Sequence, residues 1–421
     1  MGVRVGRSRA PGSGPERGGC GSPTAAHVTF FSNPNIHRLA AHAALHQLAW
    51  CVSGVFVVVF LLRAGVAPAA IFLSIAGVRV LRFLFRPLVL LVIPVLGLRR
   101  TLMFATLVFA LQFPALALVD GPGPALVLYC VVLALGESFY YPCYHTAFAA
   151  LGDVEHRGSQ LAVTQALGRI AGVIGPAVGG VALALSGPWA AFGTGALICA
   201  GAALPLRGIA EVPVERASAH DVYSAARDGV FLFLTDGWIT TCLTVAWDIM
   251  MFRALGTRYD AFGGALAAAA LIGGLGGLVL GRFIDTRRAR HAAAINGAAC
   301  IAMIVLKAGC GDAPAAAVLT ASLSAILAAL YTPSLMTAIY NDAKRSACVL
   351  RFQFAAEACW DIGSVLACLA AAAICLGGVP LQAVILMALP VAAVQTAILN
   401  GRYEAHGGRV AASVAVPNVN P

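Results

Sequence analysis

The residues of this sequence that could do chemistry are charged groups inside long apolar stretches. Arg79, Arg82 and Arg86 are spaced by three and by four, so they share one face of a helix. Glu357 and Asp361 are four apart and share one face of another helix. A charge within hydrocarbon costs about 2.5 to 3.5 kcal/mol, so each of these residues is a candidate for a function or for an ion pair.

A buried acid could carry a proton. Glu137 stands in LALGESFYYPCYH, and its aromatic neighbours in the next turns are Tyr140, Tyr144 and His145. A carboxyl group among aromatic rings could take up and release a proton, unless an arginine such as Arg169 keeps it ionised.

Two further acids and a group of histidines complete the set of polar candidates. Asp236 and Asp248 stand about 120° apart on one helix, so we expect at most one of them to face a central cavity. His37, His42 and His46 lie close together, but no further ligand is near, so the sequence predicts no metal site and an interfacial histidine cluster instead.

The composition indicates a membrane protein. The chain is 60% hydrophobic and 11% charged, with a mean hydropathy of +0.86, which is too apolar for a soluble chain of 421 residues. Its formal charge of +10 comes from basic residues scattered between apolar runs, which argues against nucleic-acid binding. Charged and Pro/Gly-rich breaks leave twelve segments long enough to cross a bilayer. They are 44–63, 69–94, 101–119, 124–148, 160–185, 188–206, 229–252, 259–282, 291–309, 315–340, 350–375 and 380–400.

Basic residues concentrate in alternate connections, so we expect both termini on the cytoplasmic side. PCYHTA at 142–147 matches PSLMTA at 333–338 with an offset of 191 residues, and the same offset places 97–101 over 288–292. A shared offset favours a duplication of six spans. The predicted parts are a disordered basic tail (1–40), a six-helix bundle (41–206), a cytoplasmic linker (207–228), a second six-helix bundle (229–400) and a disordered tail (401–421).

A polar cluster interrupts the apolar sequence after the eighth segment. Its residues are Gly281, Asp285, Arg287, Arg288 and Arg290. It resembles a loop motif of the major facilitator superfamily, the large class of twelve-helix secondary transporters, with Arg288 in place of the motif's second glycine. The equivalent first-half stretch keeps Gly97, Arg99 and Arg100 but has Pro94 in place of the acid. In the family this loop latches the two halves at the cytoplasmic face, so the resemblance implies that Asp285 holds the start of the fifth span. The alternative is positive-inside anchoring by the arginines alone.

The fifth segment carries GVIGPAVGG, three residues after Arg169. Its small residues and its proline are Gly172, Gly175, Pro176, Gly179 and Gly180. This stretch is similar to the motif in the fifth helix of antiporters of the superfamily, which implies export in exchange for another solute or ion. The alternative is close helix packing alone, because small residues at this spacing let backbones approach.

The resemblance implies an all-α membrane protein with twelve transmembrane helices in two pseudo-symmetric six-helix bundles. In the superfamily the second and eleventh spans meet between the halves, and the fourth span lines the central cavity. Counting about 1.5 Å per residue from the cytoplasmic ends then pairs Arg86 with Glu357, and Arg82 with Asp361, in the cytoplasmic half of the bilayer. Together with Arg79 these residues form either an inner gate or a permanent structural network.

We therefore expect a secondary active transporter that moves a small organic solute by alternating access, as a proton-coupled exporter. Proton-linked uptake is the alternative. An intramembrane enzyme or a sensor is disfavoured, because the sequence carries no catalytic motif, no P-loop and no long soluble segment. We expect no cofactor or metal, a monomer in a bacterial inner membrane, and as partners the solute, protons and lipid, without nucleic acid.

Overall fold

The computed structural model describes residues 33–152, 157–213, 222–284, 290–345 and 349–414. Every secondary-structure element in these ranges is a helix. The first half comprises α2 (Pro34–Val52), η1 (Gly54–Phe56), α3 (Val57–Arg63), α4 (Pro68–Leu96), α5 (Leu98–Ala117), α6 (Pro124–Leu151), α7 (Arg157–Gly201) and α8 (Ala203–Leu206). The second half comprises α9 (Val222–Ala254), α10 (Tyr259–Ile284), α11 (Arg290–Ala308), α12 (Pro314–Arg345), α13 (Val349–Leu376), α14 (Leu381–Leu386) and α15 (Ala388–Val414).

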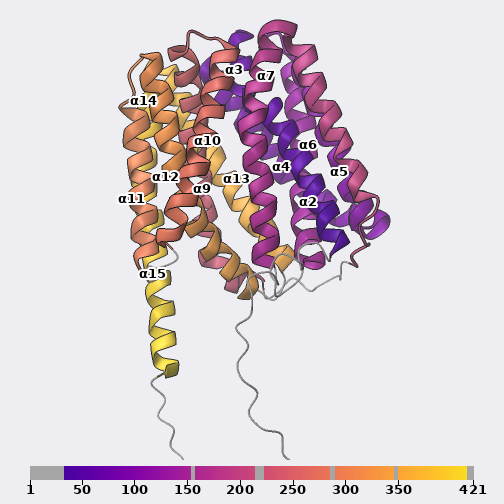
Figure 1. Ribbon diagram of the computed structural model, residues 1–421, viewed down its shortest axis with the longest axis vertical. Coiled ribbons are helices and arrows are strands. Elements are labelled where there is room, and N and C mark those ends of the chain that lie inside the picture. The colour runs from indigo at the N-terminus through magenta and orange to yellow at the C-terminus, as the bar shows by residue number, and fades with distance from the viewer. Residues whose placement is uncertain (1–32, 153–156, 214–221, 285–289, 346–348, 415–421) are drawn as a thin grey trace, which may run out of the picture.

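The helices form two bundles that lie side by side, indigo to magenta in one and red to yellow in the other (Figure 1). Within the first bundle α2 packs against α7 and α5 against α6, and within the second α9 packs against α13 and α10 against α12. The most extensive contacts between the bundles are those of α4 with α13 and of α7 with α10, and α3 with α9 and α6 with α13 also touch. The predicted all-α fold of two six-helix bundles is confirmed.

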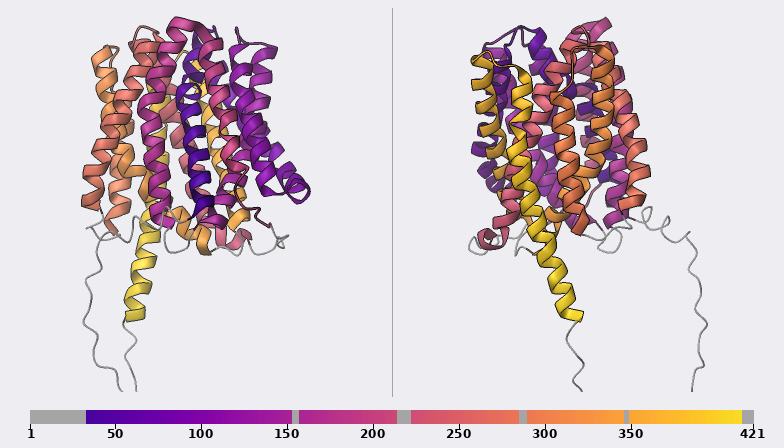
Figure 2. Two further views of the ribbon diagram at one scale, coloured as in Figure 1. Left: turned by 45° about the vertical axis from the view of Figure 1, so that its right-hand side comes forward. Right: turned by 90° about the vertical axis from the view of Figure 1, so that its left-hand side faces the viewer.

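The two ends of the molecule differ. The starts of α2 and α9 and the end of α15 lie at one end, which we name the terminal end, and α15 runs past the other helices there (Figure 2). The connections 64–67 and 255–258 lie at the opposite end, which we name the far end.

The starts of equivalent helices repeat through the chain. Helices α4, α5 and α6 begin at Pro68, Leu98 and Pro124, and α10, α11 and α12 begin at Tyr259, Arg290 and Pro314. The shift stays close to the 191 residues found in the sequence, which supports the duplication.

Two glycines with positive φ stand at the turns between successive spans. Gly97 (φ 81°) ends α4 and begins the turn into α5. Gly187 (φ 79°), followed by Pro188, breaks α7 into the expected fifth and sixth spans. A residue with a Cβ rarely adopts a positive φ, so glycine suits both turns.

Several predicted boundaries were wrong at the polar ends of helices. Helix α2 begins at Pro34, inside the expected tail 1–40, and α9 begins at Val222, inside the expected linker 207–228. Helix α15 continues to Val414, inside the expected tail 401–421. Hydropathy marks the part of a helix that lies in hydrocarbon, whereas the backbone hydrogen bonds continue into the polar ends. By length and composition, nine helices in the described ranges are apolar enough to cross a membrane.

Candidate functional site

An ion network begins inside the first bundle, near the middle of α4 and α6. Arg79 Nη1 donates to Glu137 Oε2 at 2.6 Å, and Arg82 Nη1 donates to the same oxygen at 2.9 Å. The hydroxyl of Ser138 lies 3.2 Å from the backbone oxygen of Arg82 and holds the two helices in register there. Glu137 therefore forms ion pairs with two arginines at once.

The same network crosses to the second bundle through α13. Arg82 Nη2 donates to Glu357 Oε2 at 2.8 Å, and Arg82 Nε lies 3.4 Å from Asp361 Oδ1. Arg86 Nη2 donates to Asp361 Oδ2 at 2.5 Å. Three arginines thus face three carboxylates, so the network is electrically neutral when all six groups are ionised.

Aromatic rings cover the arginines of the network. The guanidinium carbon of Arg79 lies 4.9 Å from the ring centre of Trp360, and that of Arg82 lies 5.7 Å from the ring centre of Tyr141. Cation–π contacts of this kind strengthen when they are desolvated. The Arg82 side chain is only 5% exposed, so its charge depends on these partners.

The predicted pairing was wrong in one pair and incomplete in the other. Arg86 meets Asp361 and not Glu357, while Arg82 contacts both acids of α13. Arg79, Arg82, Glu137 and Asp361 lie near mid-length of their helices, while Arg86 and Glu357 lie somewhat toward the terminal end. A count of residues ignores the crossing of the helices and the reach of an arginine, and α4 is further bent by Pro87, directly after Arg86.

The surroundings of Glu137 differ from the predicted ones. Its partners are Arg79 and Arg82, and no ion pair with Arg169 is present among the described residues. It is 5% exposed and does not line the cavity described next. The arginine stripe on α4 was visible in the sequence, but its distance from α6 was not.

A cavity of about 480 Å³ lies between α2, α6 and α7 toward the terminal end. Its lining residues are Ala43, His46, Gln47, Trp50, Tyr140, Tyr141, Tyr144, His145, Thr164, Gln165, Gly168 and Arg169. Four predicted residues, Tyr140, Tyr144, His145 and Arg169, are therefore brought together. Glu137, Asp236 and Asp248 are not among the lining residues.

Two of the histidines are buried and not interfacial. His42 Nδ1 lies 2.8 Å from the backbone oxygen of Ala202, and His42 Nε2 lies 3.1 Å from the hydroxyl of Tyr140. The ring of His46 stacks on Tyr140 with centroids 4.0 Å apart and planes 7° apart. Within the described residues no cluster of three metal-ligating side chains occurs.

Asp236 on α9 is a buried acid with neutral partners. Its Oδ1 accepts from the Tyr331 hydroxyl at 2.8 Å, and its Oδ2 accepts from Trp360 Nε1 at 3.0 Å. The Tyr331 hydroxyl also lies 3.1 Å from Gln395 Oε1. Among the described residues, no arginine, lysine or histidine forms an ion pair with Asp236.

Asp248 lies three turns further along α9, toward the far end. Lys307 is the charged group that acts on it. Lys307 Nζ donates to the backbone oxygen of Leu243 at 2.8 Å and lies 5.4 Å from the ring centre of Trp247. Lys307 stands in the last turn of α11.

The glycines of GVIGPAVGG give α7 close contacts with two helices. A Cβ at Gly175 or Gly179 would collide with backbone atoms of α2, at Cys51 and Val52. A Cβ at Gly180 would collide with the backbone of Tyr259 at the start of α10. Gly172 leaves room for a Cβ at ordinary contact distance from Ala270. These glycines thus let α7 pack closely against α2 within the first bundle and against α10 of the second bundle.

The loop motif after α10 is described only in part. Gly281 lies in α10 and Arg290 begins α11, whereas Asp285, Arg287 and Arg288 lie outside the described residues.

In the first-half copy of the loop motif, Pro94 stands where the motif has an acid. Glu211, from a different segment of the chain, supplies an acid near this turn. Glu211 Oε1 accepts from the backbone NH of Arg99 at 3.0 Å, at the N-terminus of α5. No local sequence pattern predicts this contact, because the residues lie far apart in the chain.

The far end is closed by contacts between the bundles. The Arg63 side chain of α3 donates to the backbone oxygen of Thr257 at 3.2 Å, and its guanidinium lies 4.9 Å from the ring centre of Tyr259. The rings of Phe56 and Phe262 meet edge to face, with centroids 5.9 Å apart. The cavity near the terminal end is therefore separated from the far end by packed side chains.

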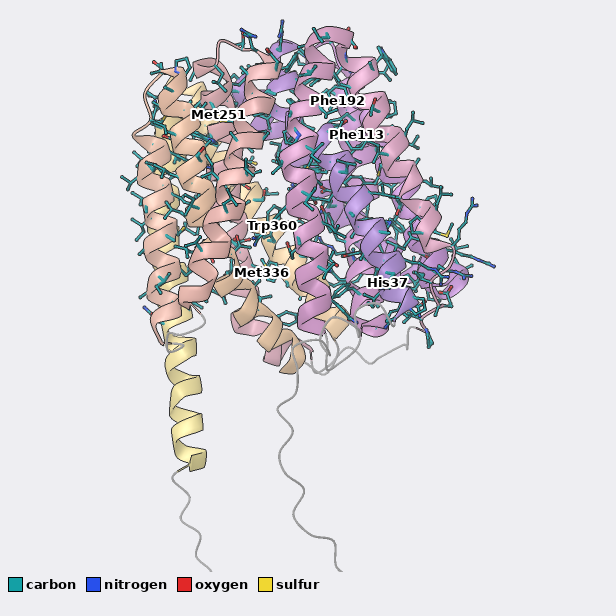
Figure 3. The ribbon with its side chains drawn as sticks, in the orientation of Figure 1. His37, Phe113, Phe192, Met251, Met336 and Trp360 are labelled. Atoms are coloured by element: carbon teal, nitrogen blue, oxygen red, sulfur yellow. The ribbon has the colours of Figure 1, made fainter. Side chains whose placement is uncertain are left out.

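Sequence analysis missed Trp360 and Tyr331, which bind Asp236 from α13 and α12. Trp360 precedes Asp361 and lies between the bundles in Figure 3. Its position beside a buried acid on the helix was a usable signal. For Tyr331 no comparable signal exists, because an aromatic residue in an apolar helix is ordinary.

Comparison with known proteins places the fold. No curated protein sequence matches the chain significantly. The nucleoside transporter NupG is 14% identical, with a TM-score of 0.61 over 88% of this chain and 98% of that one. The POT family transporter PepTSo is 12% identical, with a TM-score of 0.62 over 88% and 98%. A bacterial homologue of the iron transporter ferroportin in the inward-facing state is 12% identical, with a TM-score of 0.63 over 87% and 98%. At such identities the likeness concerns the fold alone.

A family model of the Major Facilitator Superfamily matches residues 29–368, most of the chain. The chain therefore belongs to the Major Facilitator Superfamily and is a membrane transporter, not an enzyme.

Proposed function

We propose that this transporter moves a small organic solute by alternating access, coupled to protons, with Asp236 as the group that takes up and releases the proton. The contrast between Asp236 and the acids of the ion network carries the proposal. Protonating a network acid would leave a buried arginine without its counter-charge, which is costly. Protonating Asp236 leaves no described cation without its partner, because Tyr331 and Trp360 are neutral.

Trp360 connects this carboxyl group to the network. Its Nε1 binds Asp236, and its ring lies under Arg79. On the other side of the network Tyr141, a cavity residue, lies under Arg82. A charge change at Asp236 can therefore reach the cavity wall through groups in direct contact.

The proposed direction of transport is export from the cytoplasm. Because basic residues favour the terminal end as the cytoplasmic one, the cavity of this conformation is presented to the cytoplasm. In this state an exporter loads its solute and an uptake symporter releases it, so the state by itself favours neither direction. The similarity of the α7 stretch to the antiporter motif supports export, and proton-linked uptake is the competing direction.

The coupling test uses reconstituted protein and a solute identified by thermal stabilisation in a metabolite library. Asp236→Asn should abolish accumulation driven by a proton gradient but keep exchange of labelled for unlabelled solute, since exchange needs no net protonation. Asp312→Asn, an exposed acid in the α11–α12 connection, is the matched control and should keep both activities. Retention of gradient-driven accumulation by Asp236→Asn would refute the role of this acid.

The direction test compares membrane vesicles of both orientations. A proton antiporter should accumulate the solute in inverted vesicles whose lumen is acidic, because protons leave the lumen as the solute enters. Accumulation only in right-side-out vesicles would favour the uptake symporter.

A further inference from the structure

We propose that the cavity between α2, α6 and α7 binds a planar aromatic carboxylate. This inference names the substrate class of the proposed transporter and rests on that function. Three features of the cavity carry it: its charge, its aromatic walls and its hydrogen-bonding groups.

The cavity offers a cation and no acid. Arg169 lines it and is exposed, and it forms no ion pair with a described residue. No aspartate or glutamate is among the described lining residues. Glu357 acts on His145 at the cavity edge, but Arg82 already neutralises it at 2.8 Å. The net charge that a solute meets is therefore positive, and a guanidinium binds a carboxylate through two parallel hydrogen bonds.

The walls are rich in aromatic rings. His46, Tyr140 and Tyr144 form a parallel stack, with interplanar angles of 7° and 6°. Trp50 and Tyr141 add two further rings to the lining. Aromatic pairs gain about 0.5–1.5 kcal/mol beyond burial when they stack with an offset or meet edge to face, so a planar ring is the complementary shape.

The remaining lining groups are neutral and can bind a polar substituent on the ring. Gln47, Thr164 and Gln165 offer amide and hydroxyl groups. His46 Nε2 is buried and has no hydrogen-bond partner among the described residues. A volume of about 480 Å³ is suited to a molecule of one or two rings.

The test is binding of four matched probes to the purified full chain, measured by titration calorimetry and by thermal stabilisation. The probes are phenylacetate, its neutral amide phenylacetamide, the cation phenethylamine and the non-aromatic anion cyclohexylacetate. Phenylacetate should bind about tenfold or more tightly than phenylacetamide and phenethylamine, which cannot form the charge-assisted hydrogen bond of a carboxylate. It should bind severalfold more tightly than cyclohexylacetate, which keeps the carboxylate but lacks the aromatic ring. Tighter binding of phenethylamine, or equal binding of all four, would overturn the inference.

Variants of the cavity test separately how the arginine charge and the aromatic rings contribute to binding. Arg169→Gln should weaken phenylacetate binding at least about tenfold and phenylacetamide binding little, with Arg169→Lys in between. Tyr144→Leu should weaken phenylacetate more than cyclohexylacetate. Arg100→Gln, an exposed arginine at the start of α5, is the matched control and should bind as the unchanged protein does. Unaltered binding by a folded Arg169→Gln would also overturn the inference.

The inference and the proposed function fail in different experiments. Phenylacetate binding without proton-driven transport would leave the ligand class standing and refute the coupling. Proton-driven transport of a solute that is not an aromatic anion would keep the function and refute the ligand class.

Discussion

Arg82 on α4 lies 2.8 Å from Glu357 on α13, and this ion pair joins the two bundles near the middle of their helices. The same guanidinium also contacts Glu137 and Asp361, so Arg82 is the centre of the network. The network makes these contacts while the far end is closed, which favours a structural network over its alternative, an inner gate. It is a bridge between the halves beside the cavity.

The first prediction concerns the unequal roles of two acids in the network. Glu137→Gln should destabilise the protein more than Glu357→Gln. In the described network Glu137 is the acid that pairs with Arg79, so Glu137→Gln removes that partner. After Glu357→Gln, Arg82 still contacts Glu137 and Asp361. Removing one partner of a buried pair costs about 3–5 kcal/mol.

The measurement is the Tm of the purified variants. Glu211→Gln, which removes an exposed pair with Arg99, is the control and should cost at most about 1 kcal/mol. Equal losses of Tm for Glu137→Gln and Glu357→Gln would contradict the assignment of Glu137 as the shared partner.

The sequence predicted the features that depend on local pattern. The spans, the duplication and the charged faces of α4 and α13 follow from hydropathy and helical spacing, which are properties of neighbouring residues. The partners of those charges depend on helix crossing and side-chain reach, so Arg86 was assigned to Glu357 in place of Asp361. Asp236 was named as a candidate, but its contacts with Tyr331 and Trp360 join three helices and could not be inferred from spacing.

The second prediction concerns the close approach of α7 and α10. Gly263→Val should destabilise the protein by about 1–3 kcal/mol, because a Cβ there would collide with the backbone oxygen of Pro176. Gly264→Val is the matched control, since a Cβ at Gly264 meets no atom within 4 Å. Thermal unfolding distinguishes them, and a Gly264→Val loss as large as that of Gly263→Val would refute the packing argument.

The third prediction concerns topology. On a background without native thiols, Pro122→Cys and Asp312→Cys at the far end should react with an impermeant maleimide added outside intact cells. Ala210→Cys at the terminal end should react only after the membrane is opened. All three positions are exposed in the structure, so lack of access would come from the membrane. The reverse labelling pattern would invert the orientation on which the proposed direction depends.

The last prediction concerns the latch at the far end. Arg63→Gln removes the cation over Tyr259 and the charged donor to Thr257, contacts that exist only while the far end is closed. Losing them raises the free energy of this state relative to the one open at the far end, so the population shifts toward the latter. At an exposed site the loss is about 1 kcal/mol, or roughly a fivefold change in the ratio of the two states. The reporter is Gln47→Cys, a cavity position, labelled by an impermeant maleimide from either side of oriented vesicles. Labelling from the far side should rise several-fold with Arg63→Gln and stay constant with Arg253→Gln, an exposed arginine in the last turn of α9. If Arg63→Gln leaves the far-side labelling rate unchanged in a folded protein, Phe56 and Phe262 close the far end without the arginine, and the latch has no part in the cycle.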